Sequence, residues 1–423
     1  MDQIRIRGGE KLNGTIEISG SKNAALPIIV ASLLTEKKVI IRRVPDLADV
    51  RTILELLTFF GAKLNIQSGI GGKVIEIRNE RIINNKAPYE LVRKMRASVL
   101  VLGALLARCG EAMVSLPGGC AIGTRPIDIH LKALEKLGAK ISLEDGYVKA
   151  EAPKGLTGSV INMPKVSVGA TENLMMAAVH AKGETVLHNA AKEPEIFELG
   201  CFLNSMGSRV SGMGTDKIII NGIKELSETD FTVVNDRIEA GTYAIAAAIT
   251  GGKIRLEGVN IEHLGSLFNI LSKTGVSIIN DNSSVLISRD RNILPVDIIT
   301  EPYPGFPTDM QAQMMAFLSL GDGVSKITEN IFENRFMHIP ELTRMGADIT
   351  QVGSTATVNG VRKLKGAPVM ATDLRASVSL VLAGLAAHGE TVISRIYHLD
   401  RGYENLVFKL TNCGADIKRV AGV

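Results

Sequence analysis

The residues most able to do chemistry lie in LPGGCAIGTRP, residues 116–126, where one cysteine sits in a glycine-rich loop near an arginine. A neighbouring cation such as Arg125 favours the thiolate of Cys120, which is the reactive form of cysteine. The alternative is a cysteine that only fills space in an ordinary turn. Because the flanking residues are glycine, proline and arginine, the sequence favours an exposed and reactive Cys120.

Charged residues recur where six apolar helices are expected to begin. These helix starts contain, in chain order, Lys22, Arg96, Ser167, Arg237, Asp309 and Arg375. The amino end of a helix already carries partial positive charge, so a cation there is unfavourable unless an anion binds nearby. Taken alone, each residue is also compatible with an ordinary cap or first-turn position. The recurrence of four cations instead predicts a cleft that binds phosphate and carboxylate groups.

Asp309 differs from the other starts because it is the one carboxylate among them. In a cationic cleft it is a candidate general base that takes a proton from an attacking hydroxyl group. As an N-cap it would need no catalytic role. Two further arginines, Arg335 in FENRFMH and Arg401 in HLDRGYEN, lie in polar turns and are either surface charges or part of the same site.

The elements that position these residues recur along the chain. A helix ending in an apolar residue and glycine is found at Gly61, Gly138, Gly207, Gly275, Gly346 and Gly414. The intervals between these glycines are 77, 69, 68, 71 and 68 residues, so six similar units fill the 423 residues. Each unit is expected to contain a buried inner helix, an amphipathic outer helix such as 127–138, and β-strands such as 217–222.

Six units predict an α/β fold with two lobes of three units each. We place the first lobe at residues 22–235 and the second at residues 1–21 plus 236–423, with the active site in the cleft between them. The N-terminal segment, residues 4–20, has no partner in the first lobe. It is expected to be one strand that closes the second lobe.

Composition limits the class of protein. The chain has 45% hydrophobic residues, a formal net charge of +4 and no tryptophan, which is typical of a globular protein with no surface for nucleic acid. The start lacks a signal-peptide core and no apolar run is long enough to span a bilayer, so we expect a cytoplasmic protein without a membrane partner. The four cysteines lack metal-site spacing, and loops typical of ATP or NAD binding are absent, so no metal or organic cofactor is expected.

Eight blocks of sequence resemble the UDP-N-acetylglucosamine 1-carboxyvinyltransferase family of enolpyruvyl transferases. The blocks are SGSKNAALP (19–27), VRKMRAS (92–98), LPGGCAIGTRPIDIH (116–130), KVSVGAT (165–171), PGFPTDMQAQ (304–313), ENRFMHIPEL (333–342), DLRAS (373–377) and HLDRGYENL (398–406). The resemblance implies a two-domain inside-out α/β barrel of six repeated modules, as in EPSP synthase. It also implies transfer of the enolpyruvyl group of phosphoenolpyruvate to the 3-hydroxyl of UDP-N-acetylglucosamine, with release of phosphate, as the first committed step of peptidoglycan synthesis.

The same resemblance implies residue roles. Cys120 corresponds to the general acid that protonates the methylene carbon of phosphoenolpyruvate, and Asp309 to the group that faces the attacking hydroxyl; Lys22 and Arg401 complete the catalytic set. The residues implied to bind phosphoenolpyruvate are Lys22, Asn23, Arg125, Arg335, Arg375 and Arg401. Those implied to bind the sugar nucleotide are Asn23, Arg96, Arg125, Pro126, Ile127, Asp128, Ile129, Lys165, Val166, Ser167, Val168, Asp309 and Ile331. Family members with aspartate in place of the loop cysteine escape fosfomycin, so we expect fosfomycin to alkylate Cys120.

Three alternatives remain at this stage. A shikimate-pathway enolpyruvyl transferase shares the fold and the donor but does not rely on the PGGC loop. A cysteine hydrolase would need a base, for which His130 is a candidate, but no oxyanion motif accompanies it. A non-catalytic repeat scaffold would share the six units without needing Cys120. The sequence does not determine the oligomeric state, and a monomer is favoured.

Overall fold

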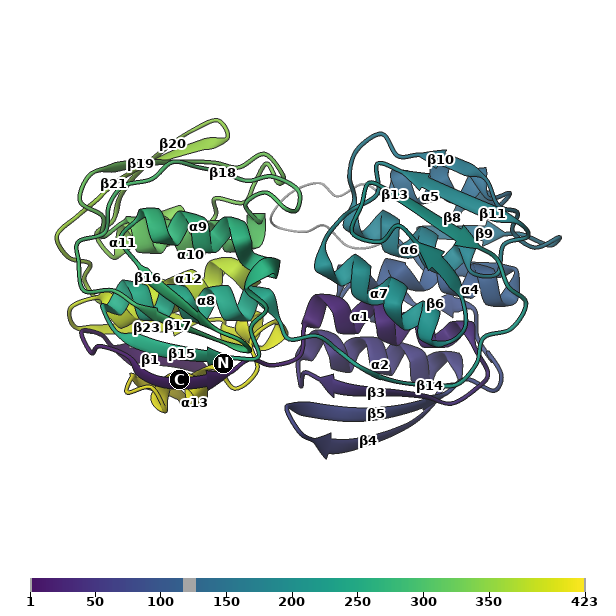
Figure 1. Cartoon of the computed structure of the whole chain (residues 1–423), viewed down its shortest axis with the longest axis horizontal. Helices are drawn as coiled ribbons and strands as arrows, with labels where there is room; N and C mark the ends of the chain where they lie inside the picture. The colour runs from purple at the N-terminus through teal and green to yellow at the C-terminus, as the bar shows by residue number, and fades with distance from the viewer. Residues whose placement is uncertain (1, 117–126, 422–423) are drawn as a thin grey trace. The chain divides into compact units, whose positions relative to one another are not determined.

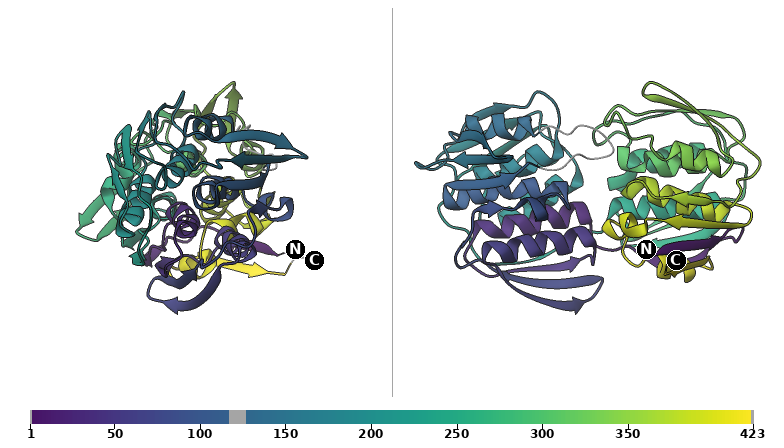
Figure 2. Two further views of the ribbon diagram at one scale, coloured as in Figure 1. Left: turned by 90° about the vertical axis from the view of Figure 1, so that its right-hand side faces the viewer. Right: turned by 180° about the vertical axis from the view of Figure 1, so that it is seen from behind.

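The chain is described by a computed structural model that covers residues 2–116 and 127–421, and these residues divide into two compact units. Unit 1 contains residues 2–19 and 235–421, and unit 2 contains residues 20–116 and 127–234. Cys120, Arg125 and Pro126, which the sequence singles out, lie outside the described residues. Each unit is an α/β structure with its helices in the interior and its sheets on the outside (Figures 1 and 2).

Unit 2 has three four-stranded sheets within the described residues. In strand order they are β14 (Thr229–Thr232), β3 (Val39–Val44), β5 (Gly72–Arg78) and β4 (Lys63–Gly69); β6 (Lys86–Ala87), β7 (Glu111–Ser115), β9 (Tyr147–Glu151) and β8 (Lys140–Glu144); and β10 (Val160–Asn162), β11 (Glu184–His188), β13 (Lys217–Asn221) and β12 (Arg209–Ser211).

Unit 1 has three sheets of the same size in the part of the chain that is described. In strand order they are β2 (Asn13–Glu17), β15 (Lys253–Glu257), β17 (Ser284–Ser288) and β16 (Ser277–Asp281); β18 (Ile298–Ile299), β19 (Val324–Thr328), β21 (Thr355–Asn359) and β20 (Asp348–Val352); and β22 (Pro368–Met370), β23 (Glu390–Ser394), β1 (Gln3–Arg7) and β24 (Asp416–Val420).

All six of these sheets share one pairing pattern. In each, the first strand in the order above pairs in parallel with the second, and the remaining two pairings are antiparallel. A shared pattern of this kind is the structural counterpart of the sequence repeat. The described chain is therefore built from six copies of one α/β module.

The N-terminal segment pairs with the second half of the chain, as expected, but as two strands rather than one. Strand β1 lies between β23 and β24, and β2 pairs in parallel with β15 in a different sheet. The chain passes Gly8 between these strands, where a Cβ atom would lie only 2.2 Å from the carbonyl oxygen of Gly384. This close approach requires glycine directly after β1.

Each module contributes an inner helix, which is almost wholly buried, and a half-buried outer helix. In unit 2 the inner elements are α1 (Lys22–Ala31) with η1 (Ser32–Leu34), η2 (Arg96–Leu100) with α4 (Val101–Cys109), and α6 (Val168–Ala178); the outer helices are α2 (Ala48–Phe60), α5 (Asp128–Lys136) and α7 (Pro194–Ser205), and α3 (Tyr89–Val92) is a short addition. In unit 1 the inner elements are α8 (Arg237–Thr250), η4 (Thr308–Met310) with α10 (Gln311–Leu318), and α12 (Leu374–Ala386); the outer ones are η3 (Ile261–Leu264) with α9 (Gly265–Lys273), α11 (Ile339–Arg344), and η5 (Ile396–Arg401) with α13 (Leu406–Thr411).

The six repeat glycines end the outer helices. All of them have positive φ angles, from 91° at Gly275 to 108° at Gly61. This left-handed conformation is the usual way to end a helix, and glycine adopts it without a steric penalty. The motif recognised in the sequence is thus a helix stop that directs the chain into the next strand.

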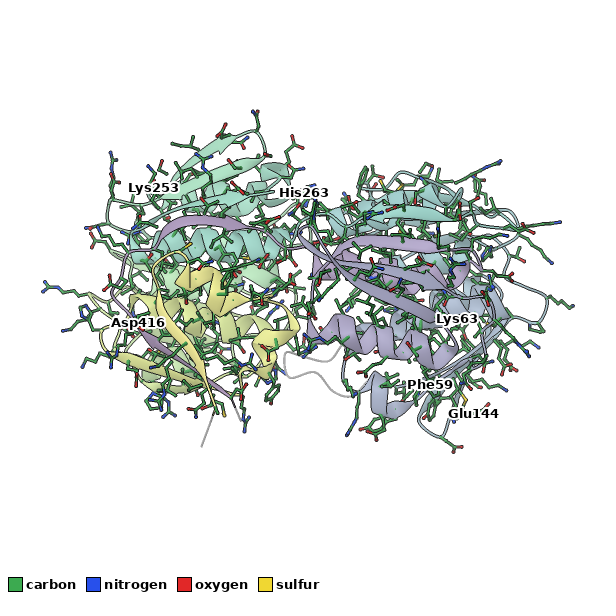
Figure 3. All side chains as sticks on the ribbon, turned by 90° about the horizontal axis from the view of Figure 1, so that it is seen from below. Phe59, Lys63, Glu144, Lys253, His263 and Asp416 are labelled. Atoms are coloured by element: carbon green, nitrogen blue, oxygen red, sulfur yellow. The ribbon has the colours of Figure 1, made fainter. Side chains whose placement is uncertain are left out.

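Each unit has its own hydrophobic core between its helices and sheets. Three edge strands, β4, β8 and β24, each carry an exposed charge at one end. These charges are Lys63, Glu144 and Asp416 (Figure 3). Such charges oppose pairing with strands of other chains. Within the described residues, every helix is too short or too polar to cross a membrane.

Candidate active site

A carboxylate held by two guanidinium groups forms the charged centre of unit 1. Arg335 Nη2 donates to Asp309 Oδ1 at 2.7 Å, and Arg375 Nη2 donates to Asp309 Oδ2 at 3.0 Å. The side chains of Arg335 and Arg375 are only 6% and 3% exposed, whereas that of Asp309 is 27% exposed. The two cations are therefore fixed inside the unit while part of the carboxylate faces outward.

Helix caps and turns bring these three side chains together. Arg375 lies in the first turn of α12, where the carboxylate of Asp373 accepts the backbone N–H groups of Arg375 and Ala376. Asp309 lies in the turn η4, just before the inner helix α10. The alternative that Asp309 is an N-cap is wrong. Pro307 occupies the N-cap position of η4, and the Asp309 carboxylate binds the two arginines.

Glu329 orients the turn that contains Ile331 and Arg335. Its Oε1 accepts the Ile331 N–H at 2.8 Å, and its Oε2 accepts the hydroxyl of Thr308 at 2.8 Å. Thr308 in turn accepts from Arg335 Nη1 at 2.9 Å. This buried carboxylate therefore links the turn to η4, which contains Asp309.

Tyr403 supports Arg375 from the other side. Arg375 Nη1 donates to the Tyr403 hydroxyl at 3.1 Å, and that hydroxyl lies 2.9 Å from Thr242 Oγ1 of α8. Gln313 of α10 donates to the backbone oxygen of Asp309 at 2.8 Å and contacts the same hydroxyl at 3.4 Å. All three inner helices of unit 1 thus contribute to the orientation of Arg375 and Asp309.

The electrostatics of this cluster keep Arg375 charged. Burial favours the neutral guanidine, but the negative charge of Asp309, together with Tyr403 and Asp236, outweighs it and raises the pKa of Arg375. A buried guanidinium has few waters to screen it, so its field on a bound anion is strong. Arg401, the last residue of η5, is partly buried in the same unit.

Lys22 is the corresponding buried cation of unit 2. It is the first residue of α1, whose N-cap Ser21 accepts the Ala24 N–H. Lys22 Nζ lies 3.5 Å from Asp49 Oδ2, and both side chains are nearly buried. Asn23 follows it on α1 and is partly exposed. The charge at this helix start is therefore balanced in part by a carboxylate of the protein, as Arg375 is by Asp309.

Apart from Asn23 on α1, the described residues implied to bind the sugar nucleotide in unit 2 lie at three further helix starts. Arg96 begins η2, residues 127–129 lead into α5, and residues 165–168 lead into α6, where Ser167 is the N-cap. Asp128, Lys165 and Val168 are exposed, while Ile127, Val166 and Ser167 are partly buried and Ile129 is buried. Free backbone N–H groups at helix starts suit the binding of anionic groups.

His130 is not placed to act as the base of a cysteine hydrolase. Its ring is buried, and its Nδ1 lies 3.0 Å from Asn173 Nδ2. Burial and the nearby charge of Arg96 lower the pKa of His130 to about 4. This histidine is therefore a neutral interior residue near pH 7.

The structure adds residues that sequence analysis missed. Glu329, Thr308 and Tyr403 complete the hydrogen bonds around Asp309 and Arg375. Thr308 is next to Asp309 and Tyr403 is two residues after Arg401, so their positions in the sequence could have indicated a role in the site. Glu329 had no comparable signal, because its role depends on a turn that only the fold forms.

The comparison with protein families places this chain among the enolpyruvyl transferases. A family model described as EPSP synthase (3-phosphoshikimate 1-carboxyvinyltransferase) matches residues 6–410. The enolpyruvyl transferase NikO from Streptomyces tendae superimposes with a TM-score of 0.89 at 24% identity, covering 100% of this chain and 99% of that one. EPSP synthase from Acinetobacter baumannii gives a TM-score of 0.77 at 19% identity, with 100% of both chains covered. These structures share the six-module α/β fold predicted from the sequence, and that prediction is confirmed.

Curated relatives identify the branch of this class. UDP-N-acetylglucosamine 1-carboxyvinyltransferase from Acidiphilium cryptum is 57% identical over 420 residues, covering 99% of this chain and 100% of the relative. The enzymes of the same name from Gluconacetobacter diazotrophicus and Granulibacter bethesdensis are 56% and 55% identical, with at least 99% of each chain covered. This chain belongs to the UDP-N-acetylglucosamine 1-carboxyvinyltransferase family and is an enzyme of that type.

Proposed function

We propose that this enzyme transfers the enolpyruvyl group of phosphoenolpyruvate to the 3-hydroxyl of UDP-N-acetylglucosamine and releases phosphate. This is the first committed step of peptidoglycan synthesis. Full-length relatives at 55–57% identity support the substrate pair. The single structural observation that supports the chemistry is Asp309, a partly exposed carboxylate held by two buried guanidinium groups.

We propose Asp309 as the base for the acceptor. A carboxylate oxygen can accept more than one hydrogen bond, so the exposed part of Asp309 can receive the proton of the 3-hydroxyl while Arg335 and Arg375 hold it in place. The hydroxyl oxygen then bonds to C2 of phosphoenolpyruvate. Lys22, Asn23, Arg125, Arg335, Arg375 and Arg401 are proposed to bind the phosphate and carboxylate of that donor.

We propose Cys120 as the acid of the same step. As C2 accepts the acceptor oxygen, the Cys120 thiol gives its proton to C3, which becomes a methyl group and yields a tetrahedral intermediate. Loss of phosphate from C2 and of one proton from C3 then restores the double bond in the product. Fixed cations stabilise the charge on the phosphate as its bond to C2 breaks.

We place the sugar nucleotide at Arg96, the helix starts 127–129 and 165–168, Asp309 and Ile331, with Asn23, Arg125 and Pro126 completing the set. Backbone N–H groups at the starts of α5 and α6 suit the diphosphate. These residues come from both units, so the proposal requires both units to act on one substrate pair. We therefore also propose the two lobes expected from the sequence, with the active site in the cleft between them. The lobes are residues 22–235 and residues 1–21 plus 236–423.

The shikimate-pathway alternative is less well supported. Identity is 19–20% to two EPSP synthase structures from Acinetobacter baumannii, which supports the fold alone. The identities of 55–57% belong to enzymes named for the sugar nucleotide. From the sequence we further propose small-molecule substrates only, a cytoplasmic location and a monomer.

The test is phosphate release from phosphoenolpyruvate with and without UDP-N-acetylglucosamine, using wild type, Cys120→Ala and Asp309→Ala. The expected result is release that requires the sugar nucleotide and is lost in both variants. Release with 3-phosphoshikimate instead would favour the alternative. Mass spectrometry after incubation with fosfomycin checks Cys120 separately, because an unmodified loop peptide would contradict a reactive thiol.

A further inference from the structure

Asn173 is a fully buried polar residue of the inner helix α6. Its carboxamide has one acceptor oxygen and a nitrogen with two hydrogens to donate, and all three are used within unit 2. Oδ1 accepts the Gly103 N–H at 2.6 Å, while Nδ2 donates to the Val99 carbonyl at 3.2 Å and to His130 Nδ1 at 3.0 Å. One buried amide therefore connects α6 to two other segments.

Two of these hydrogen bonds take the place of a helical one. In an uninterrupted α-helix the Gly103 N–H donates to the Val99 carbonyl. Both groups bond instead to the Asn173 carboxamide, at the junction where the 3₁₀ turn η2 passes into α4. A side chain inserted into a helix in this way sets the course of the preceding turn, and that turn begins with Arg96.

Gly103 makes the insertion sterically feasible. A Cβ atom at this position would lie 2.2 Å from Asn173 Oδ1 and 2.4 Å from Asn173 O. Both distances are far below van der Waals contact. The close approach of α4 to α6 is therefore built into the sequence by glycine and asparagine together.

The third hydrogen bond reaches α5 through His130. Because Asn173 donates to Nδ1, the neutral ring carries its hydrogen on Nε2. The low pKa of His130, about 4 and caused first by burial, keeps Nδ1 available as an acceptor near pH 7. The ring also packs against the first turn of α6, since a Cβ atom at Gly169 would lie 3.4 Å from His130 Cε1.

We propose that Asn173 and His130 are positioning residues for the acceptor substrate. Their hydrogen bonds fix Arg96, the start of α5 and the start of α6 relative to one another within unit 2. Together with Asn23 on α1, these segments are the described parts of unit 2 proposed to bind the sugar nucleotide. The inference rests on the proposed function, and it predicts an effect on acceptor binding rather than on donor binding or on the chemical step.

The test is a comparison of kinetic constants for Asn173→Ala and His130→Ala. We expect the KM for UDP-N-acetylglucosamine to rise about tenfold in each, because a buried polar group loses its partner. The KM for phosphoenolpyruvate and the kcat should change by less than about twofold. The double variant should be no worse than the more impaired single variant, because both changes break one connected network.

A conservative variant distinguishes the loss of the hydrogen bond from the loss of side-chain volume at position 130. His130→Asn places an amide oxygen where Nδ1 accepts from Asn173, so it should return the acceptor KM to within about threefold of wild type. Asn79→Ala is the matched control, because Asn79 is also fully buried in unit 2 but bonds to Ser32 O, at 2.8 Å. It should lower the thermal midpoint without raising the acceptor KM.

The outcomes are distinguishable. Equal rises in both KM values, or lower stability with unchanged constants, would overturn the positioning role. If Asn173→Ala does not fold, the two His130 variants decide the question. Wild-type enzyme without phosphate release in the presence of UDP-N-acetylglucosamine would contradict the proposed function instead, and calorimetric binding of the sugar nucleotide to the same variants would still test positioning.

Discussion

The two units are built from the same module but stabilise their candidate site residues differently. In unit 1 the centre is charged: Asp309 lies between Arg335 and Arg375, and the two arginines are buried. In unit 2 the helix layer contains a neutral pair, Asn173 and His130, joined by a hydrogen bond, in addition to the buried ion pair of Lys22 and Asp49. One module design therefore supports both a fixed charge cluster and a fixed set of helix starts.

The two arrangements suit the groups that we propose near them: reacting groups at Asp309, and a diphosphate at the helix starts of unit 2. Charge that develops during a reaction is best stabilised by cations held in place away from water. A diphosphate can instead be bound by backbone N–H groups at helix starts, which need correct placement more than buried charge. Neutral hydrogen bonds provide that placement without the cost of burying an ion.

The largest expected effect comes from removing the central carboxylate of unit 1. Asp309→Asn should lower kcat by about 10²- to 10⁴-fold, because the amide cannot take the proton of the acceptor. Asp49→Asn is the matched change in unit 2, where the carboxylate lies beside Lys22, and we expect a loss of about tenfold. Phosphate release under saturating substrates measures both. Equal losses would remove the distinction between the units.

Two glycines of inner helices test how tightly each unit is packed. Gly103→Ala should lower the free energy of unfolding by about 3 kcal/mol, because the new methyl group meets the Asn173 backbone. Gly241→Ala in α8 of unit 1 should cost about 1 kcal/mol. Its methyl group meets only the side-chain ends of Leu267 and Met310, which can move. Denaturant unfolding of both variants checks this order, and a larger loss at Gly241 would contradict it.

The buried pair of Glu239 and Lys409 in unit 1 predicts a pH effect. Burial raises the pKa of Glu239 to about 7, against the opposing effect of Lys409 at 2.8 Å. The folded protein therefore keeps this proton between about pH 4.5 and 7 while the unfolded chain loses it, so stability falls as pH rises through this range. The expected contribution is about 2 to 3 kcal/mol.

Glu239→Gln should remove that contribution, because the amide does not titrate. The measurement is the free energy of unfolding at pH 4.5 and at pH 7 for wild type and variant. We expect the variant to lose less stability over this interval than wild type. Parallel pH profiles would show that Glu239 does not titrate there.

A small effect on both stability and donor binding is expected at Tyr403. Tyr403→Phe removes the hydroxyl that contacts Arg375 and Thr242, so the free energy of unfolding should fall by about 1 to 2 kcal/mol. The KM for phosphoenolpyruvate should rise a few-fold, because Arg375 loses one of its orienting bonds. An increase confined to the acceptor KM would instead connect this hydroxyl to the sugar nucleotide.

Much of the fold was predictable because its signals are local. The repeat glycines ended helices, the amphipathic segment 127–138 formed an outer helix, and the segment 217–222 formed a strand. The division of residues 4–20 into two strands was missed. That division depends on pairing with strands far along the chain in two different sheets, which no local pattern encodes.

The candidate site was predictable only as a set of residue types. Asp309, Arg335 and Arg375 were recognisable from their motifs, but their contacts join residues 26 and 66 positions apart in sequence. The Asn173 network, which joins residues 70 and 43 positions apart, was missed because a single asparagine in an apolar helix carries no pattern.

The sequence by itself determined the six modules, the starts and ends of their helices, and the residue types available for chemistry. These properties depend on neighbours within a few positions, through helical periodicity and backbone conformation. Only the tertiary structure decided that Asp309 binds two buried arginines and that the Asn173 side chain forms hydrogen bonds with backbone groups where η2 meets α4. Such contacts depend on how distant helices pack, since burial makes each polar group find a partner wherever the fold brings one within reach.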